Sequence, residues 1–423
     1  MIKKIMIWFI VIWPGFLLSQ NTPSVNLNEC LTKASINYPL ANQKQLLVAA
    51  NNLKLQNIET GFLPQFMLNG QVSYQSDVTS LPISIPGMNI PETSKDWYKL
   101  NVDISQLIYD GGALNKQKEF EKANTDIEVQ NIEIALYKVK ELVQTAYFNI
   151  ILLNENKRAI LLLQNELEEK LSTVKSAVEN GVMLASNRDN LMAELLKIEQ
   201  NIFELDLGIE SSIKNLNILT GLQLTVKDKF IIPETNIVLT EDNKRPELAL
   251  FDLQRSKISL LKEMTSLKRK PMVLGFGQAG FGRPALNMLS NDFEPYFVVG
   301  AKVSWKILDW GKTKNELKSL DIQSQMINSN KEVFDTNLEL LLIKKQSEIQ
   351  RLESLILKDN QIVNLKKNVA RASSSQFDNG LITSTEYLLE KNAETKAMMS
   401  LQLHQVQLSY AKIDYEYTMG KLN

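Results

Sequence analysis

Residues 132–150 read IEIALYKVKELVQTAYFNI and lie within an uninterrupted helix-forming run from Gly112 to Asn180, which ends at Gly181. The run contains no proline and no internal glycine. Its apolar stripe, with steps of three and four, comprises Ile132, Ala135, Leu136, Val139, Leu142, Val143, Ala146 and Ile150. This spacing is typical of a coiled coil or a long packed helix. At 1.5 Å per residue the run would reach roughly 100 Å, several times the length of a normal globular helix.

A second run of the same kind extends from Lys312 to Asn379 and ends at Gly380. The landmarks around the two runs have identical spacings: Asp110–Gly181 matches Asp309–Gly380, and Gly181–Gly221 matches Gly380–Gly420. Matched spacings predict a structural repeat of helix, β-hairpin, long helix and helix. We expect a first repeat at 20–221, an inter-repeat segment at 222–244 and a second repeat at 245–423.

The segments between the helices change from a period of 3.6 to a period of 2, which predicts β-strands. The expected strands are at about 65–75, 97–106, 272–281 and 296–305. Each has about ten residues, the length of a transmembrane β-strand. The alternation at 272–281 is poor, so the pattern does not assign the faces of that strand. From Leu27 to Gly61 the period is helical and predicts a buried side that includes Leu31, Leu46 and Leu53.

The overall composition is that of a folded protein with balanced charge: 423 residues, 44% hydrophobic, 22% charged and a formal net charge of -1. Balanced charge gives no basic face for nucleic acid. Lys3 and Lys4 followed by apolar residues 5–18 predict a signal peptide at 1–19. Elsewhere no apolar run reaches the ~20 residues of a spanning helix, so a membrane-embedded chain would have to form a barrel. The only cysteine, Cys30, lies in a helical pattern and is expected in the core.

Three motifs that suggest chemistry have simpler explanations. Residues 275–280 spell G-x-G-x-x-G, but Pro284 and a loop follow instead of the helix that a dinucleotide site requires. Residues 310–313 end like a phosphate loop, but Lys306 stands where its first glycine belongs. His404 is the only histidine, which favours a polar helix-face residue over a metal ligand. We therefore expect no catalytic site, no cofactor, no metal and no enzymatic activity.

Short motifs flank the predicted elements in a fixed order: GFLP at 61–64, SQLIYDGG at 105–112, NG at 180–181, LTG at 219–221, RPEL at 245–248, Pro271, ILDWG at 307–311, NG at 379–380 and Gly420. In this order and spacing they resemble the TolC family of outer-membrane efflux channels over essentially the whole mature chain. The resemblance implies a mainly α fold with a β-barrel portion. It also implies a homotrimer, with an α-helical tunnel in the periplasm and one shared transmembrane β-barrel in the outer membrane.

The resemblance further implies a passive conduit of a tripartite efflux or type I secretion system, exporting small molecules or proteins. Its partners would be a periplasmic adaptor (membrane fusion protein) and an inner-membrane pump. Four strands cannot close a barrel alone, which agrees with a trimer. Loops 76–96 and 283–295 would face outside the cell. The alternative is a periplasmic coiled-coil adaptor or scaffold, although adaptors typically place β-domains at the ends of one hairpin.

The resemblance also suggests where a periplasmic gate would lie. Acidic residues just past the second turn form a constricting ring in the family, and Glu386 falls at a matching position with Glu390 one turn later. Asn187 and Asp189 hold the comparable place in the first half. The expected adaptor-contact tips are Asn180, Gly181, Val182, Asn379, Gly380 and Leu381. A solvated helix face for Glu386, and turn chemistry alone for the Asn-Gly pairs, are the alternatives.

Overall fold

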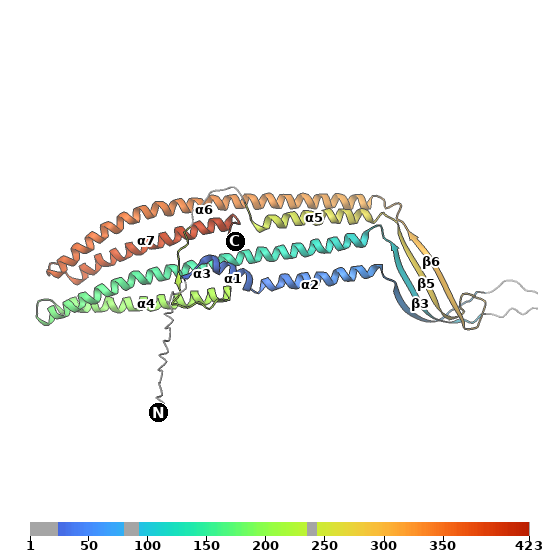
Figure 1. Cartoon of the computed structure of the whole chain (residues 1–423), viewed down its shortest axis with the longest axis horizontal. Helices are drawn as coiled ribbons and strands as arrows, with labels where there is room; N and C mark the ends of the chain where they lie inside the picture. Colours follow the sequence, from blue (N-terminus) through green and yellow to red (C-terminus); the bar gives the residue numbers. More distant parts are fainter. Residues whose placement is uncertain (1–23, 80–92, 235–242, 423) are drawn as a thin grey trace, which may run out of the picture.

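The computed structural model describes residues 24–79, 93–234 and 243–422. The predicted signal peptide at 1–19 and part of the inter-repeat segment lie outside these ranges. The molecule is long and narrow, with helices along most of its length and a β-sheet at one end (Figure 1). The fold class predicted for the single chain, mainly helical with a barrel-type sheet, is confirmed.

Seven α-helices are present in the described ranges. Their bounds are α1 Leu27–Asn37, α2 Leu40–Glu59, α3 Ala113–Glu179, α4 Ala185–Thr220, α5 Pro246–Leu267, α6 Lys312–Asp378 and α7 Ser384–Thr418. A 3-10 turn (Thr60–Phe62) follows α2, and two short strands, β1 (Ser24–Val25) and β4 (Lys229–Phe230), pair in parallel near the middle of the molecule. The long helices α3 and α6 have 67 residues each. The predicted repeat and domain boundaries remain predictions.

The helices form two long hairpins, α3 with α4 and α6 with α7, which reach the end of the molecule opposite the sheet (Figure 1). Helices α2 and α5 run beside the other halves of α3 and α6, toward the sheet. In the described residues, no helix has both the length and the apolar character needed to cross a membrane.

The main core lies in the middle of the molecule, where α1, α3, α4 and α7 meet. Cys30 is fully buried there, as predicted, and burial raises the pKa of its thiol to about 12. Leu31 is also buried, but Leu46 and Leu53 of α2 are 68% and 62% exposed, so the predicted buried side of α2 is wrong for the single chain. Leu142 of the predicted α3 stripe is likewise 55% exposed. Within the described part of the chain, no element covers these apolar residues.

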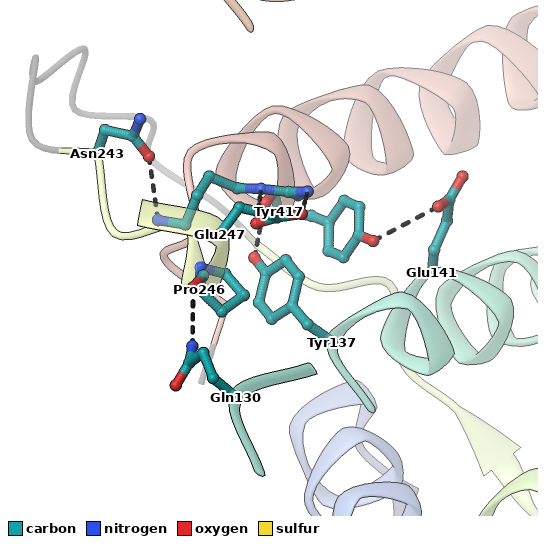
Figure 2. A network of polar contacts seen from close by, with 8 residues as sticks. Gln130, Tyr137, Glu141, Asn243, Pro246, Glu247 and Tyr417 are labelled. Carbon is teal, nitrogen blue, oxygen red and sulfur yellow. Dashed lines mark hydrogen bonds and ion pairs between the residues drawn. The ribbon is translucent and has the colours of Figure 1, made fainter. Parts of the chain in front are cut away.

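A network beside this core attaches the start of α5 and the end of α7 to α3 (Figure 2). The guanidinium of Arg245 pairs with Glu247 at 2.5 Å and lies 5.1 and 5.6 Å from the ring centres of Tyr137 and Tyr417. The two tyrosine rings stack at 4.7 Å, and the Tyr137 hydroxyl donates to the backbone carbonyl of Tyr417. Gln130 donates to the carbonyl of Pro246 at 2.7 Å. These contacts hold the start of α5 and the end of α7, which are far apart in the sequence, against α3.

The sheet has four antiparallel strands in the order β2 (Gln65–Tyr74), β3 (Asp96–Tyr109), β5 (Met272–Arg283) and β6 (Glu294–Ser304). Strands β3 and β5 pair, which joins the two hairpins into one sheet. Strands β2 and β6 are therefore the two edges, each paired on one side only within the described chain.

The register gives the sheet one apolar and one polar face. Paired rows such as Leu68, Val102, Ala279 and Phe297 lie on one face, and rows such as Asn69, Asn101 and Gly280 lie on the other. We call these the apolar face and the polar face. The apolar face exposes Phe66, Leu68, Val72, Leu100, Phe281, Phe297, Val299 and Val303, each by more than half of its surface. The register with β3 also assigns the faces of β5, which its sequence left open.

On the polar face, one carboxylate is held by three side-chain amides from three strands. The Asp103 carboxylate accepts hydrogen bonds from Asn69 (2.6 Å), Asn101 (2.8 Å) and Gln278 (2.6 Å). Three side-chain amide donors thus satisfy the oxygens of one carboxylate on this face. The polar face is thus organised for contact with water.

Candidate functional site

Both predicted tips are tight turns at the end of the molecule farthest from the sheet. Gly181 and Gly380 have φ of 69° and 70°, the left-handed region that glycine adopts without strain. The backbone N–H of Val182 donates to the backbone carbonyl of Ala177 at 2.8 Å, and the N–H of Leu381 donates to the backbone carbonyl of Gln376 at 2.9 Å. This is the Schellman geometry that ends helices.

The tip turns present apolar side chains to solvent. Val182, Leu184 and Leu381 are 77%, 74% and 74% exposed. The Asn-Gly pairs are explained by turn geometry alone, whereas exposed apolar groups on a polar turn are suited to contact with another protein. The adaptor-contact role of the tips remains a prediction.

Glu386, the first predicted gate residue, caps the N-terminus of α7. Its carboxylate accepts from the backbone N–H and the hydroxyl of Thr383, at 2.8 and 2.9 Å, and the Glu386 N–H donates to the Thr383 hydroxyl oxygen at 3.3 Å. This is a capping box. The hydrogen bond from the Thr383 backbone, and then the one from its hydroxyl, hold the pKa of Glu386 below its usual value. The Thr-x-x-Glu spacing of this capping box is present in the sequence but was not among the predicted features.

The other three predicted gate residues have separate partners. Glu390 pairs with Lys366 of α6 at 3.1 Å, and Asp189 pairs with Arg188 at 2.8 Å. Asn187 differs, because its side-chain oxygen accepts from the backbone N–H of Ser384 at 2.9 Å and so joins α4 to the start of α7. The four residues therefore do not form one cluster within this chain, and their gate role remains a prediction.

A second contact between α4 and α7 lies next to Asn187. The Asn190 amide is within hydrogen-bond distance of both the Ser384 and the Thr385 hydroxyl, at 3.2 and 3.1 Å. Ser384 is fully buried. The two hairpins are thus bonded to each other immediately behind their tips.

A larger polar group, which the sequence did not predict, joins α3 to α7 on the side of the tip turns that faces the middle of the molecule. We call Glu166, Tyr387, Lys391 and Glu394 the tip cluster. The Lys391 ammonium lies 2.5 Å from Glu166 and 2.8 Å from Glu394. The Tyr387 hydroxyl donates to Glu166 at 3.3 Å, and its ring stacks on Phe377 of α6 at 5.1 Å.

Burial and charge act in opposite directions on the pKa of Lys391 but in the same direction on the pKa of Tyr387. Burial lowers the pKa of Lys391, but hydrogen bonds to Glu166 and Glu394 outweigh it, and the net pKa is raised. Burial, and then the Glu166 charge, raise the pKa of Tyr387. Lys170 of α3 adds an ion pair to Asp378 of α6 at 2.5 Å. Two ion pairs, Lys391–Glu166 and Lys170–Asp378, thus join α3 to the α6/α7 hairpin.

The described residues contain no group of three or more His, Cys, Asp or Glu side chains arranged to hold a metal ion. His404 lies on α7 with its Nδ1 atom 2.5 Å from a carboxylate oxygen of Asp359 on α6, within the α6/α7 hairpin. That contact is structural pairing between neighbouring helices.

The chain is similar in structure to several solved outer-membrane proteins, some of them described as channels. The channel CmeC of Campylobacter jejuni is 17% identical, with a TM-score of 0.64 over 93% of this chain and 85% of that one. MtrE of Neisseria gonorrhoeae, solved in its open state, is 15% identical, with a TM-score of 0.66 over 96% and 95%. VceC of Vibrio cholerae is 13% identical, with a TM-score of 0.65 over 93% and 96%.

No family model and no curated protein matches the sequence. The structural likeness nevertheless extends over 93–96% of this chain and 85–96% of the three solved chains. The chain has the fold of the outer-membrane channels. The resemblance to the TolC family that its repeated motifs indicated is confirmed at the level of the fold.

Proposed function

We propose that the protein is the outer-membrane channel of a tripartite efflux or type I secretion system, a homotrimeric passive conduit for small molecules or proteins. The observation that carries the proposal is the two-faced, open sheet at the end of the long helices. An apolar face exposed to this extent is suited to lipid, and the polar face around Asp103 is suited to a wet lumen.

The open edges of the sheet supply the argument for a trimer. Unpaired backbone groups are not tolerated in hydrocarbon, so β2 and β6 must pair with strands of neighbouring chains. Three chains of four strands would give a twelve-stranded barrel, within the size range of transmembrane barrels. The uncovered apolar residues of α2 and α3, such as Leu46 and Leu142, would then be covered by neighbouring helices.

The long helices support a periplasmic tunnel. With 67 residues, α3 and α6 each extend roughly 100 Å at 1.5 Å per residue. A freestanding pore would not need such a length, whereas a channel that meets an adaptor and an inner-membrane pump would. The described residues do not favour the alternative of a periplasmic adaptor or scaffold, because one strand pair follows α2 and the other follows α5 in the chain, and the two pairs join into one sheet.

The proposal is tested by crosslinking the edge strands. In a Cys30→Ser background, single cysteines on the polar face of β2 are combined with single cysteines on the polar face of β6, in several registers. Oxidation in outer-membrane fractions should give covalent trimers, and the reconstituted protein should conduct ions. A matched pair across β3 and β5, such as Asp103→Cys with Gln278→Cys, should crosslink only within one chain. Recovery of a stable, natively folded monomer that does not conduct would contradict the proposal.

A further inference from the structure

The two junctions at which a strand leads into a long helix have the same geometry. The Asp110 carboxylate accepts from the backbone N–H groups two and four residues later, at 2.8 and 2.6 Å, and that of Asp309 does the same at 3.1 and 3.0 Å. The residue after each aspartate has a positive φ, which is 70° at Gly111 and 53° at Trp310. The junctions are therefore equivalent, with tryptophan in the second where the first has glycine.

Trp310 is an unusual residue for this position. The left-handed region strains any residue that carries a Cβ atom, whereas glycine adopts it freely. Trp310 is also 89% exposed in the single chain. A large aromatic side chain that is kept on a strained backbone and left in solvent indicates a contact that the single chain does not provide.

The first junction lies against the turn between α5 and β5. A Cβ atom on Gly111 would lie 2.8 Å from the Cβ of Lys270, and the Lys270 ammonium donates to the Gly111 carbonyl at 3.3 Å. The pairing of β3 with β5 brings this turn to the junction. Strand β6 has no partner on its outer side within the described chain, so the corresponding space beside Trp310 is open.

The turn between α2 and β2 is the counterpart of the turn between α5 and β5. The N–H of Leu63 donates to the carbonyl three residues earlier at 3.0 Å, and the N–H of Lys270 does so at 2.9 Å. A proline and then the first residue of a strand follow both. Strand β2 is the other open edge of the sheet, and Leu63 is 57% exposed. Leu63 therefore holds, at a free edge, the place that Lys270 holds beside Gly111.

We propose that β6 of one protomer pairs with β2 of the next in the register of β3 with β5, and that Trp310 packs on Leu63 of the neighbouring protomer. The inference rests on the proposed function, because it requires the chains to close into a ring. The 2.8 Å approach at Gly111 leaves no room for a side chain, so the joint between protomers is wider by roughly 1 Å, which restores ordinary van der Waals separation.

The proposed register is fixed to the residue. Ser105, five residues before the capping aspartate, pairs with Phe276, five residues after the proline that precedes β5. The residues at the same two places on the free edges are Ser304 and Asn69. Both belong to the polar face, so the register continues each face of the sheet from one protomer to the next. Ser304 of one protomer should thus lie opposite Asn69 of its neighbour.

The same register explains why β6 ends early. Strand β3 continues for four residues beyond Ser105, because β5 continues beside it. The counterparts of these residues, 305–308, follow the end of β6 and are not part of the strand, and Ile307 and Leu308 are 68% and 65% exposed. Strand β2 of the neighbour would supply the missing partner, so we expect residues 305–308 to extend β6 on assembly.

Disulfide crosslinking in outer-membrane fractions tests the register. In a Cys30→Ser background, Ser304→Cys is combined in the same chain with Met67→Cys, Asn69→Cys or Gln71→Cys. The Asn69→Cys combination should give several times more covalent trimer than the other two, which are displaced by roughly 7 Å along the strand. Strands β2 and β6 are opposite edges of the sheet in one chain, so each disulfide has to join two protomers.

Dissociation of the trimer in SDS tests the Trp310 contact. Trp310→Ala keeps the strained backbone but removes the ring, and it should speed dissociation roughly tenfold, as should Leu63→Ala. The double variant should be little worse than either, because both changes remove one contact. Trp310→Phe should restore much of the wild-type rate, and Trp310→Gly should dissociate like Trp310→Ala although it relieves strain within the chain.

The matched control is Tyr109→Ala, because this aromatic residue lies at the same level of the sheet in the joint within the chain and should not affect dissociation. Covalent trimers in another register would overturn the inference and leave the channel proposal standing. Additive effects of Trp310→Ala and Leu63→Ala, or none, would overturn the contact, because Trp310 would then face lipid or solvent. If no combination gives covalent trimers and the protein does not conduct, both proposals fail.

Discussion

Replacing Lys391 with methionine should loosen the contact between the two helical hairpins. Met preserves much of the length and the apolar stem of lysine but removes the cation that joins Glu166 of α3 to α7. The pKa of Lys391 is raised above its ordinary value of 10.5. The stabilisation that the charged Lys391 contributes is therefore fully present below pH 10.5, and it is lost only as the pH rises through the higher folded-state pKa of Lys391.

The size of the effect follows from exposure. The side chains of Lys391 and Glu394 are 14% and 9% exposed, and Glu166 is 39% exposed. Breaking a buried ion pair costs about 3–5 kcal/mol, because a charge is left without a partner. An exposed pair is worth less than about 1 kcal/mol. With one partner in the solvent, we expect a loss of about 2 kcal/mol, roughly thirtyfold in the equilibrium between joined and separated hairpins.

Single-channel recordings and hydrogen exchange measure the consequence. Lys391→Met should raise the open probability and speed amide exchange in α3 and α7 near Glu166. The matched control is Lys366→Met, since the pair with Glu390 lies within the α6/α7 hairpin at 39% and 29% exposure. We expect that control to leave amide exchange in α3 near Glu166 close to wild type, because the Lys366–Glu390 pair joins α6 to α7 only. If the two variants change amide exchange in α3 equally, or if neither changes it, the Lys391–Glu166 pair does not join the hairpins in the way proposed.

Three further predictions concern the starts of α6 and α7. Glu386→Gln keeps the capping box but removes the charge, so it should reduce cation selectivity in recordings; Thr383→Ala should instead cost about 1 kcal/mol of stability and leave selectivity unchanged. The pKa of Glu386 is lowered from 4.5, so the stabilisation that its carboxylate contributes is present above pH 4.5 and is lost as the pH falls through the folded-state pKa. Amides at the start of α7 should therefore lose protection from hydrogen exchange in acid, and Glu386→Gln should not show this loss. Trp310 has φ of 53°, so Trp310→Gly should raise the free energy of unfolding by about 1 kcal/mol in denaturant titrations.

Local chemistry made the helices and turns predictable from the sequence. A helix continues while no residue interrupts it, and it ends where glycine can adopt the left-handed region, as Gly181 and Gly380 do. These rules operate over a few residues, so a single sequence reveals them. The Thr383–Glu386 capping box obeys the same kind of rule and was available to the same reasoning.

The tip cluster could not be predicted in the same way. Tyr387 and Glu166 are 221 residues apart in the chain, and only the packing of one hairpin on the other brings them together. The exposed Leu46 shows a second limit of the sequence. The helical period of α2 predicts that one face is apolar, but it does not say which element, if any, covers that face. Both cases depend on contacts between elements, within the chain for Tyr387 and between chains, by our proposal, for Leu46.

The two faces of strand β5 could not be assigned from its own sequence either. Its alternation fails because the apolar face carries Gly277 and Ala279, while Phe276 lies on the polar face, where its ring approaches the position of a Cβ on Gly300 to 2.7 Å. Read alone, such a strand has no hydrophobic side. Paired with β3 and β6, it becomes the floor of a groove whose walls come from its neighbours. The face to which each residue of β5 belongs is thus fixed by its pairing with β3 and β6, which no local period in its own sequence reveals.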